Sequence, residues 1–350
     1  NNLTTANAAV VNIINLNNVR YNIEMAVQFN IAGMPLIYQD TLNDPFNPRS
    51  GDLTGQAANA INASFNINNY DIGHALHATS GGGSGVAGIG VSCNNTFSSG
   101  VGPWKARGWS GGVNQNTLAI GIMIHEIGHM LGSPHTFNGN AGSCGSNGQI
   151  STNTAFEIGS GNTIMSYAGS CGVQNIQSSS DNYFHSKSLE MFINRINSVG
   201  CHNETATGNT PPTVNANPCN GNFTIPKLTP FSLQGSASDP DAGQTITYTW
   251  EQIDEDGSGT PTQGFVGTAA GNSALAPLFR SYPPSASGIK RTFPTLNTIL
   301  NSANVSTFEP LPNVGRTLNF RLTARDNNPT NGGIGSSDLS VTVNGAAGPL

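Results

Sequence analysis

The sequence predicts a mixed α/β domain followed by an all-β sandwich, and three observations carry this prediction. The chain has 350 residues, which is more than one ordinary domain needs. Its first two hundred residues mix helical and strand periodicities, whereas residues 205–217 are rich in Thr, Asn and Pro. Beyond them the apolar residues recur with period two. We therefore expect an α/β (α+β) domain with a twisted mixed sheet at 1–204, a linker at 205–217 and a β-sandwich at 218–350.

The most informative stretch of the first domain is a histidine motif on an expected helix. His125 and His129 are four residues apart, so they share one helical face and can bind one ion. Gly132 tolerates the positive φ that ends a helix, so the chain can turn and bring His135 to the same ion. Three histidines with an open fourth position suit a catalytic zinc. Glu126 is rotated around the helix and is placed to act as general base on the attacking water.

This H-E-x-x-H-x-x-G-x-x-H pattern resembles the metzincin clan of zinc endopeptidases. The resemblance implies a methionine turn under the metal, and Met165 in the stretch N-T-I-M-S-Y is the candidate for it. Tyr167, two residues later, then lies near the metal, where its phenol is expected to assist Glu126 by stabilising the oxyanion. A methionine and a tyrosine packed in a core strand are the alternative interpretation. The resemblance thus implies zinc as the cofactor.

Further runs resemble the secreted bacterial reprolysin-like (adamalysin-like) metallopeptidases over roughly residues 1–201. These runs lie at 70–74, 155–161 and 181–185. The resemblance implies an exported enzyme that cleaves protein or peptide substrates and is made as a latent precursor with a prodomain. The chain departs from adamalysins in the Thr136-Phe137 pair after the third histidine, which is pappalysin-like, and in Tyr167, where a proline is usual.

The resemblance also implies a substrate-binding edge strand. The small residues Val86, Ala87 and Gly88 lie where an extended peptide would add to the sheet as an antiparallel strand. An ordinary glycine-rich hairpin is the alternative interpretation.

Composition indicates an extracellular protein. Charged residues make up 9%, against about 25% in typical domains, and amide and hydroxyl residues take their place. The net charge of −6 and the absence of a basic stripe argue against nucleic acid as a partner. No apolar run reaches the roughly 20 residues of a membrane span. No secretory leader is seen, so we expect a processed or truncated form.

The five cysteines fit disulfides better than a structural zinc site, because none forms a C-x-x-C pair. Cys144 and Cys171 follow the third histidine and the methionine turn, so a bridge between them would tie these stretches together. A bridge from Cys93 to Cys201 would follow the adamalysin pattern. Cys219 stays unassigned: it is either free or replaces Cys201.

Within the first domain we expect helices at about 4–18, 57–64, 117–131 and 181–198, and strands at 21–29, 72–78 and 86–92. A metzincin strand normally precedes the first helix, and this chain has no residues to form it. The strand is therefore either missing or misaligned.

The C-terminal part resembles cadherin-like and PKD-like modules, which implies an immunoglobulin-like sandwich. Expected strands lie at 231–237, 246–250, 318–324 and 339–343. Asp239, Asp241 and Asp326 either converge on a calcium ion or are solvated turn residues; both interpretations stay open.

The sequence therefore favours a secreted zinc endopeptidase with Glu126 as its base. One alternative is an extracellular binding or adhesion protein with a vestigial protease domain, although the intact Glu126 argues against it. Another is a zinc hydrolase of a non-peptide substrate. Glu157, which precedes the methionine turn, is a further hypothesis: it supports either a ligand histidine or the turn.

Overall fold

The structure divides into two compact units. It is a computed structural model that describes residues 3–38, 44–46, 52–77, 84–98, 100–112, 117–146, 148–255, 264–301 and 306–350. The first unit contains 1–22, 26–133 and 190–207, and the second contains 23–25, 134–189 and 208–350. The stretch that follows the histidine helix thus belongs to the same compact unit as the C-terminal strands.

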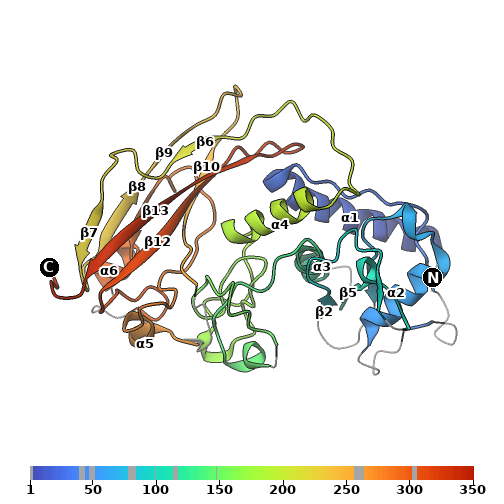
Figure 1. Cartoon of the computed structure of the whole chain (residues 1–350), viewed down its shortest axis with the longest axis horizontal. Coiled ribbons are helices and arrows are strands. Elements are labelled where there is room, and N and C mark those ends of the chain that lie inside the picture. The colour runs from blue at the N-terminus through green and yellow to red at the C-terminus, as the bar shows by residue number, and fades with distance from the viewer. Residues whose placement is uncertain are drawn as a thin grey trace. The chain divides into compact units, whose positions relative to one another are not determined.

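The first unit is a mixed α/β structure (Figure 1). Its three-stranded sheet has β5 (Gly108–Gly111) in the middle, parallel to β1 (Ala75–His77) and antiparallel to β2 (Gly85–Ala87). A short antiparallel pair joins β3 (Phe97–Ser98) and β4 (Val101–Pro103). The helices are α1 (Leu3–Met25), α2 (Leu53–Ser64), α3 (Thr117–Met130) and α4 (Ser186–Ser198), with the 3₁₀ turns η1 (Ile67–Asn69) and η2 (Trp104–Ala106). The expected mixed sheet and the expected helix at about 117–131 are present.

The strand predicted at 21–29 is wrong, because α1 continues to Met25 and ends where Ala26 adopts a φ of +53°. The buried positions of α1 follow the helical period rather than period two: Ile13, Asn17, Asn18, Tyr21 and Glu24. Three of these five residues are polar, so the apolar residues alone do not show the helical pattern. The alternation of apolar and polar residues after position 21 was therefore a coincidence.

Tertiary contacts of Tyr21 stabilise this helical end. Its side chain is fully buried, and its hydroxyl donates to the carbonyl of Ile124 in α3 at 2.7 Å. The ring also meets Phe192 of α4 with centroids 6.1 Å apart. One tyrosine thus links α1 to two other helices of the first unit.

In the second unit the longest strands form a four-stranded sheet in the order β10 (Thr247–Gln252), β12 (Arg316–Arg325), β13 (Ile334–Asn344) and β7 (Phe223–Pro226) (Figure 1). β12 pairs antiparallel with both neighbours, whereas β7 runs parallel to β13. Two further pairs join β8 (Phe231–Gln234) with β11 (Lys290–Phe293), and β6 (Thr213–Asn215) with β9 (Ser236–Ser238). The helices α5 (Gly267–Gly271) and α6 (Leu296–Asn301) are short.

The apolar core of these sheets follows the alternation expected from the sequence. On β12 the side chains of Leu318, Phe320, Leu322 and Ala324 are fully buried. They belong to one core cluster with Trp250 and Phe293. The same cluster contains Ile158, which comes from the stretch 134–189 rather than from the C-terminal strands. The period-two pattern at 318–324 is thus confirmed as a strand; an immunoglobulin-like arrangement stays a prediction.

Candidate metal centre

Helix α3 presents two histidines on one face. The ring centroids of His125 and His129 lie 4.7 Å apart, as expected for residues one turn apart. The helix ends at Met130, and Gly132 adopts a φ of +103°, a left-handed conformation that other residues rarely adopt. The Ser133 N–H donates to the Gly128 carbonyl and closes this turn. The local sequence therefore ends the helix immediately before the third histidine.

His125, His129 and His135 each offer one nitrogen, and these nitrogens all lie within 4.8 Å of one another. In the described ranges this is the only group of three ligand-bearing side chains. Nδ1 of His129 lies 2.7 Å from the Ser133 carbonyl, and Nδ1 of His135 lies 2.6 Å from the Gln149 carbonyl. A ring nitrogen beside a carbonyl carries the proton, so Nε2 keeps the lone pair that a metal needs. The donor set fits zinc.

Glu126 lies beside the histidines on α3 and is 5% exposed. Burial raises the pKa of its carboxyl to about 8. The carboxylate packs against the backbone of β2: a Cβ added to Gly85 would come within 2.6 Å of Oε1 of Glu126. Its other oxygen, Oε2, has no hydrogen-bond partner among the described residues. The glycine in β2 therefore leaves space for the carboxylate.

Strand β2 contains Val86 and Ala87 of the expected substrate edge, and Gly88 follows it directly. It is a terminal strand of its sheet as far as the structure is described, with β5 as its partner. The side chain of Val86 is 52% exposed. The next residues attach to the end of α3, because the Gly90 N–H donates to the His129 carbonyl at 2.8 Å. The edge strand is thus fixed relative to the helix that carries two of the histidines.

The methionine-turn stretch has little regular structure. Met165 is fully buried, and its carbonyl accepts from the Thr136 N–H at 3.1 Å. Thr136 directly follows His135, so the turn is bonded to the residue next to the third histidine.

The buried Glu157 carboxylate holds the same two segments together. Thr136 Oγ1 donates to its Oε1 at 2.5 Å, and the Asn162 and Thr163 N–H groups donate to its Oε2 at 2.8 and 3.1 Å. Thr163 Oγ1 donates to Oε1 as well. Glu157 is 1% exposed. A buried carboxylate with this many donors is well satisfied and fixes both segments.

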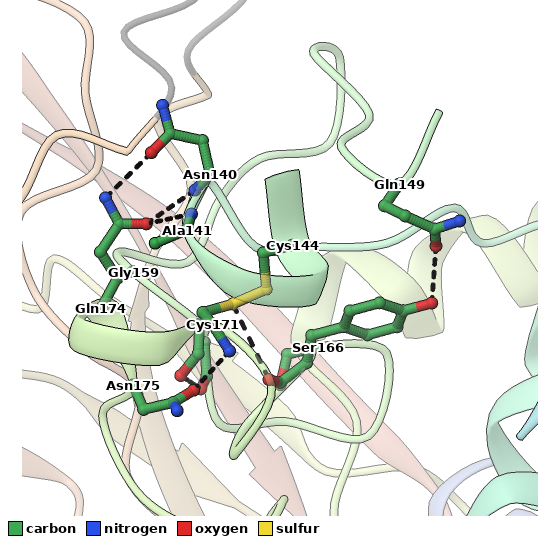
Figure 2. Close-up of a disulfide and its surroundings, with 12 residues drawn as sticks. Asn140, Ala141, Cys144, Gln149, Gly159, Ser166, Cys171, Gln174 and Asn175 are labelled. Carbon is green, nitrogen blue, oxygen red and sulfur yellow. Dashed lines mark hydrogen bonds between the residues drawn. A yellow bond between two sulfur atoms is a disulfide. The ribbon is translucent and has the colours of Figure 1, made fainter. Parts of the chain in front are cut away.

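Tyr167 contacts the third histidine, with ring centroids 4.4 Å apart, and stacks on Phe137 at 4.8 Å. Its hydroxyl donates to Oε1 of Gln149 at 2.6 Å (Figure 2). The backbone carbonyl of the same Gln149 lies beside Nδ1 of His135. Sequence reasoning missed Gln149, because it lies in an irregular loop and no motif marks it.

The two expected disulfides are present. Cys144 of η3 (Gly142–Gly145) is joined to Cys171, which precedes η4 (Gly172–Gln174), with Cα atoms 5.0 Å apart (Figure 2). Around this bridge the Gln174 side chain accepts from the Asn140 and Ala141 N–H groups.

Cys93 is bridged to Cys201 in the first unit, with Cα atoms 5.8 Å apart. Beside it Arg195 of α4 donates to Ser92 Oγ at 3.2 Å. Cys219 is free and exposed, so the alternative pairing of Cys93 with Cys219 is excluded.

The three aspartates considered for calcium are not brought together with each other as the histidines are. Asp326 accepts from the Gly333 and Asn328 N–H groups, and Asp239 accepts from the Asp241 N–H. Asp241 accepts from the Thr210 N–H. The contacts of Asp239 with Asp241 and of Asp326 with Asn328 are those of turn-forming aspartates, whereas the contact of Asp241 with Thr210 joins residues 31 apart; a calcium ion at these aspartates stays a prediction.

Comparison with known proteins gives one family match. Residues 7–136 match the family described as metallo-peptidase family M12B, reprolysin-like. A search of curated proteins found no match. Within the described residues, no helix has the length and apolarity that a membrane crossing requires. Residues 7–136 are therefore a reprolysin-like metallopeptidase domain with the three-histidine cluster, and this family points to zinc-dependent peptidase activity on protein or peptide substrates.

Proposed function

We propose that this chain is a secreted zinc-dependent endopeptidase in which Glu126 is the general base. The observation that carries the proposal is the convergence of three histidine nitrogens within 4.8 Å at the end of a reprolysin-like segment. His125, His129 and His135 would hold the ion. Zinc bound there supplies the Lewis acidity that activates water and polarises the scissile carbonyl.

Glu126 would transfer the proton. Its carboxylate takes a proton from the attacking water and delivers it to the leaving amine. Two observations support this role: the carboxylate is next to a ligand histidine in α3, and its Oε2 accepts no hydrogen bond from the described residues. The Glu157 carboxylate, by contrast, accepts from Thr136, Asn162 and Thr163.

Strand β2 would hold the substrate. An extended peptide can pair with the exposed side of Val86, Ala87 and Gly88, because backbone groups at a sheet edge accept a further strand. Pairing fixes the register of the peptide, which brings one carbonyl to the reacting groups and reduces the entropic part of the barrier. Gly85 at the start of the same strand contacts Glu126. One strand would thus position both the substrate backbone and the base.

Tyr167 would act mainly on His135. Its ring packs on the imidazole, and its hydroxyl holds Gln149, whose carbonyl fixes the Nδ1 proton of the same histidine. The phenol could stabilise an oxyanion only after leaving Gln149. We therefore assign Tyr167 a positioning role in the arrangement described here.

Export and a latent precursor are part of the proposal. The Cys93–Cys201 and Cys144–Cys171 disulfides suit an oxidising compartment, and the low content of charged residues suits an extracellular surface. Expression with and without a secretory leader would check export, with correct pairing of all four cysteines expected only after secretion.

The activity is tested by proteolysis of a denatured protein substrate with metal removed and restored. We expect cleavage that a chelator abolishes and that one equivalent of zinc restores. Metal content measured in parallel should be one zinc per chain. A chain that binds zinc, is correctly disulfide-bonded and cleaves neither proteins nor peptides would support the binding or adhesion alternative instead.

A further inference from the structure

A chain of buried polar groups leads from the methionine turn to the C-terminal strands. The Asn162 side-chain amide donates to the Tyr183 hydroxyl at 3.2 Å, and this hydroxyl donates to Ser281 Oγ at 2.7 Å. Ser281 Oγ in turn donates to Oε1 of Glu251, in strand β10, at 2.8 Å. None of the four residues is more than 3% exposed. The methionine turn is therefore bonded, through two hydroxyls, to a strand of the four-stranded sheet.

Tyr183 is the link in this chain. Besides its hydroxyl contacts, its backbone carbonyl accepts from the Ile164 N–H at 3.0 Å, next to Met165. Burial, followed by the charges of Glu251 and Glu157, raises the pKa of its phenol well above 10. The phenol thus stays protonated and can accept from Asn162 while donating to Ser281. One residue holds the turn by its backbone and ties it to the sheet by its side chain.

Glu251, the last residue in this series of hydrogen bonds, is itself held in place. Oε2 of Glu251 accepts from the Ser186 N–H at 2.9 Å, and His185 lies 3.9 Å from Oε1. Arg325 of strand β12 is 2% exposed, donates to the Phe184 carbonyl at 3.0 Å and pairs with Glu24 at 3.1 Å. Polar groups from two strands of the sheet therefore hold the residues just after Tyr183.

Other contacts join the stretch 134–189 to the C-terminal segment 208–350 without involving Tyr183. The Gly264 N–H donates to the Asn138 carbonyl at 2.5 Å, and the Gln174 side chain donates to the Gly264 carbonyl at 2.9 Å. Ile158 packs in the core cluster formed by the C-terminal strands. The stretch 134–189 has few backbone ladders of its own, so these contacts supply much of what orders it.

We propose that the C-terminal strands are a structural part of the metal centre, which hold the methionine turn in place through Ser281 and the positioning residue Tyr183. The segment 208–350 is therefore not a module that could be removed without affecting the metal centre. Removing a hydroxyl in the chain leaves buried donors or acceptors without partners, and the turn relaxes. The inference rests on the proposed zinc site, because its effect is on the geometry of that site.

The test compares two serine-to-alanine substitutions in the full-length chain. Ser281→Ala breaks the polar chain. Ser273→Ala is the matched control, because Ser273 is also buried in the C-terminal part but, among the described residues, its Oγ accepts from the nearby Leu275 and Ala276 N–H groups alone. Zinc affinity is measured by competition with a chromophoric chelator, the absorption spectrum of the cobalt-substituted protein reports ligand geometry, and thermal unfolding reports stability.

We expect Ser281→Ala to weaken zinc binding about 10-fold, the lower end of effects seen for residues that support metal ligands, and to change the cobalt spectrum. Ser273→Ala should change neither the zinc affinity nor the cobalt spectrum, even if it lowers the unfolding temperature as much as Ser281→Ala does. Tyr183→Phe keeps the ring and removes the hydroxyl, so it should reproduce the Ser281→Ala spectrum. The double variant should add little to either single variant, because both break one chain.

Wild-type affinity and spectrum in both Ser281→Ala and Tyr183→Phe would overturn the inference while leaving the peptidase proposal intact. Should Ser281→Ala fail to fold, Tyr183→Phe alone decides by the same two readouts. A wild-type chain that bound no zinc would overturn the metal site and this inference together.

Discussion

Two stretches that supply the candidate metal centre are built by different means. Helix α3 places His125 and His129 by backbone periodicity, so the local sequence at residues 125–129 determines how they face. The stretch 134–189 has only short 3₁₀ turns before α4, and one disulfide and buried side chains such as Glu157 hold it. A ligand on a helix depends on its neighbours in sequence, whereas a turn like this depends on distant polar partners. The comparison predicts that variants in the two stretches will fail differently.

The largest effect is expected in the helix. His129→Ala removes one of three ligands, so zinc binding and proteolysis should both be lost, by more than about a thousandfold in activity. The helix should remain, because alanine has the highest helix propensity. Far-ultraviolet circular dichroism and zinc content would show this, and a variant that retained both zinc and activity would contradict the assignment.

A glycine of the edge strand tests the base without touching the metal. In Gly85→Ala the new Cβ would lie 2.6 Å from the Glu126 carboxylate, so the carboxylate must move. Displacement of a reacting group by about 1 Å costs roughly 100-fold in rate, so kcat should fall by about that factor with zinc affinity unchanged.

Gly121→Ala in α3 is its control, because a Cβ there meets nothing within 4 Å. Equal activity in the Gly85 and Gly121 variants would show that Gly85 does not position Glu126.

The methionine-turn stretch should respond through Glu157. Glu157→Gln replaces one acceptor oxygen by an NH2 group, which cannot accept from the surrounding N–H and O–H donors. We expect zinc affinity about 10- to 100-fold lower, together with a loss of stability of about 2–4 kcal/mol.

Thr136→Ser keeps the hydroxyl that donates to Glu157 and should behave almost as wild type, whereas Thr136→Val should shift toward the Glu157→Gln phenotype. Zinc titration and denaturant unfolding of the three variants measure this. Unchanged zinc affinity in Glu157→Gln would limit Glu157 to a role in stability.

The Cys144–Cys171 bridge should affect stability more than chemistry. It closes a sequence separation of 27 residues, for which chain entropy predicts about 3.5 kcal/mol of stabilisation. The double serine variant should therefore unfold at lower denaturant while the zinc affinity of its folded form changes less than in Glu157→Gln. If the double serine variant lost more zinc affinity than stability, both expressed as free energies, the disulfide and not the Glu157 carboxylate would hold the methionine turn in place.

The smallest effect expected is the dependence of stability on pH through Glu251. Burial acts to raise the pKa of this carboxyl, but the charges of His185 and Arg325 and the hydrogen bonds from Ser281 and Ser186 outweigh it and lower the pKa from its ordinary 4.5. A carboxyl with a lowered pKa in the folded state stabilises the fold above about pH 4.5, and this contribution is lost as the pH falls through the folded value.

Glu251→Gln should therefore be less stable than wild type at neutral pH, and the difference should narrow below about pH 4.5. The groups that face Glu251 are His185, Arg325, Tyr183 and Ser281. Denaturant unfolding at a series of pH values measures the difference. A difference that did not change with pH would contradict the assigned direction.

The difference between helix α3 and the stretch 134–189 also explains which parts of the fold could be predicted from the sequence. In α3 and in strands such as β12, the spacing of the histidines or of the apolar residues shows the helical or strand period directly. The end of α1 was predicted as a strand because its buried face includes the polar Asn17 and Glu24, and the partner of Glu24 comes from elsewhere in the fold. Glu24 pairs with Arg325, which is 301 residues away. A pattern of apolar residues cannot show such a contact.

The candidate site divides in the same way. Its three histidines and Glu126 all lie within residues 125–135 and were predicted, and so were the cysteine pairs that flank the motifs. Gln149 and the acceptor contacts of Glu157 lie in loops whose paths depend on tertiary structure, so spacing could not reveal them. The polar chain through Tyr183 could be found only from coordinates, because it joins residues 98 apart in sequence.

The most direct test of the account is the rate of proteolysis by Glu126→Gln compared with wild type at equal zinc content. Glu204→Gln is the control, because that carboxylate is 87% exposed. General-base catalysis typically contributes about 10²- to 10⁴-fold, so we expect a loss of that size in the Glu126 variant alone, with zinc still bound. Full activity of Glu126→Gln with zinc bound would contradict the assignment of Glu126 as the base.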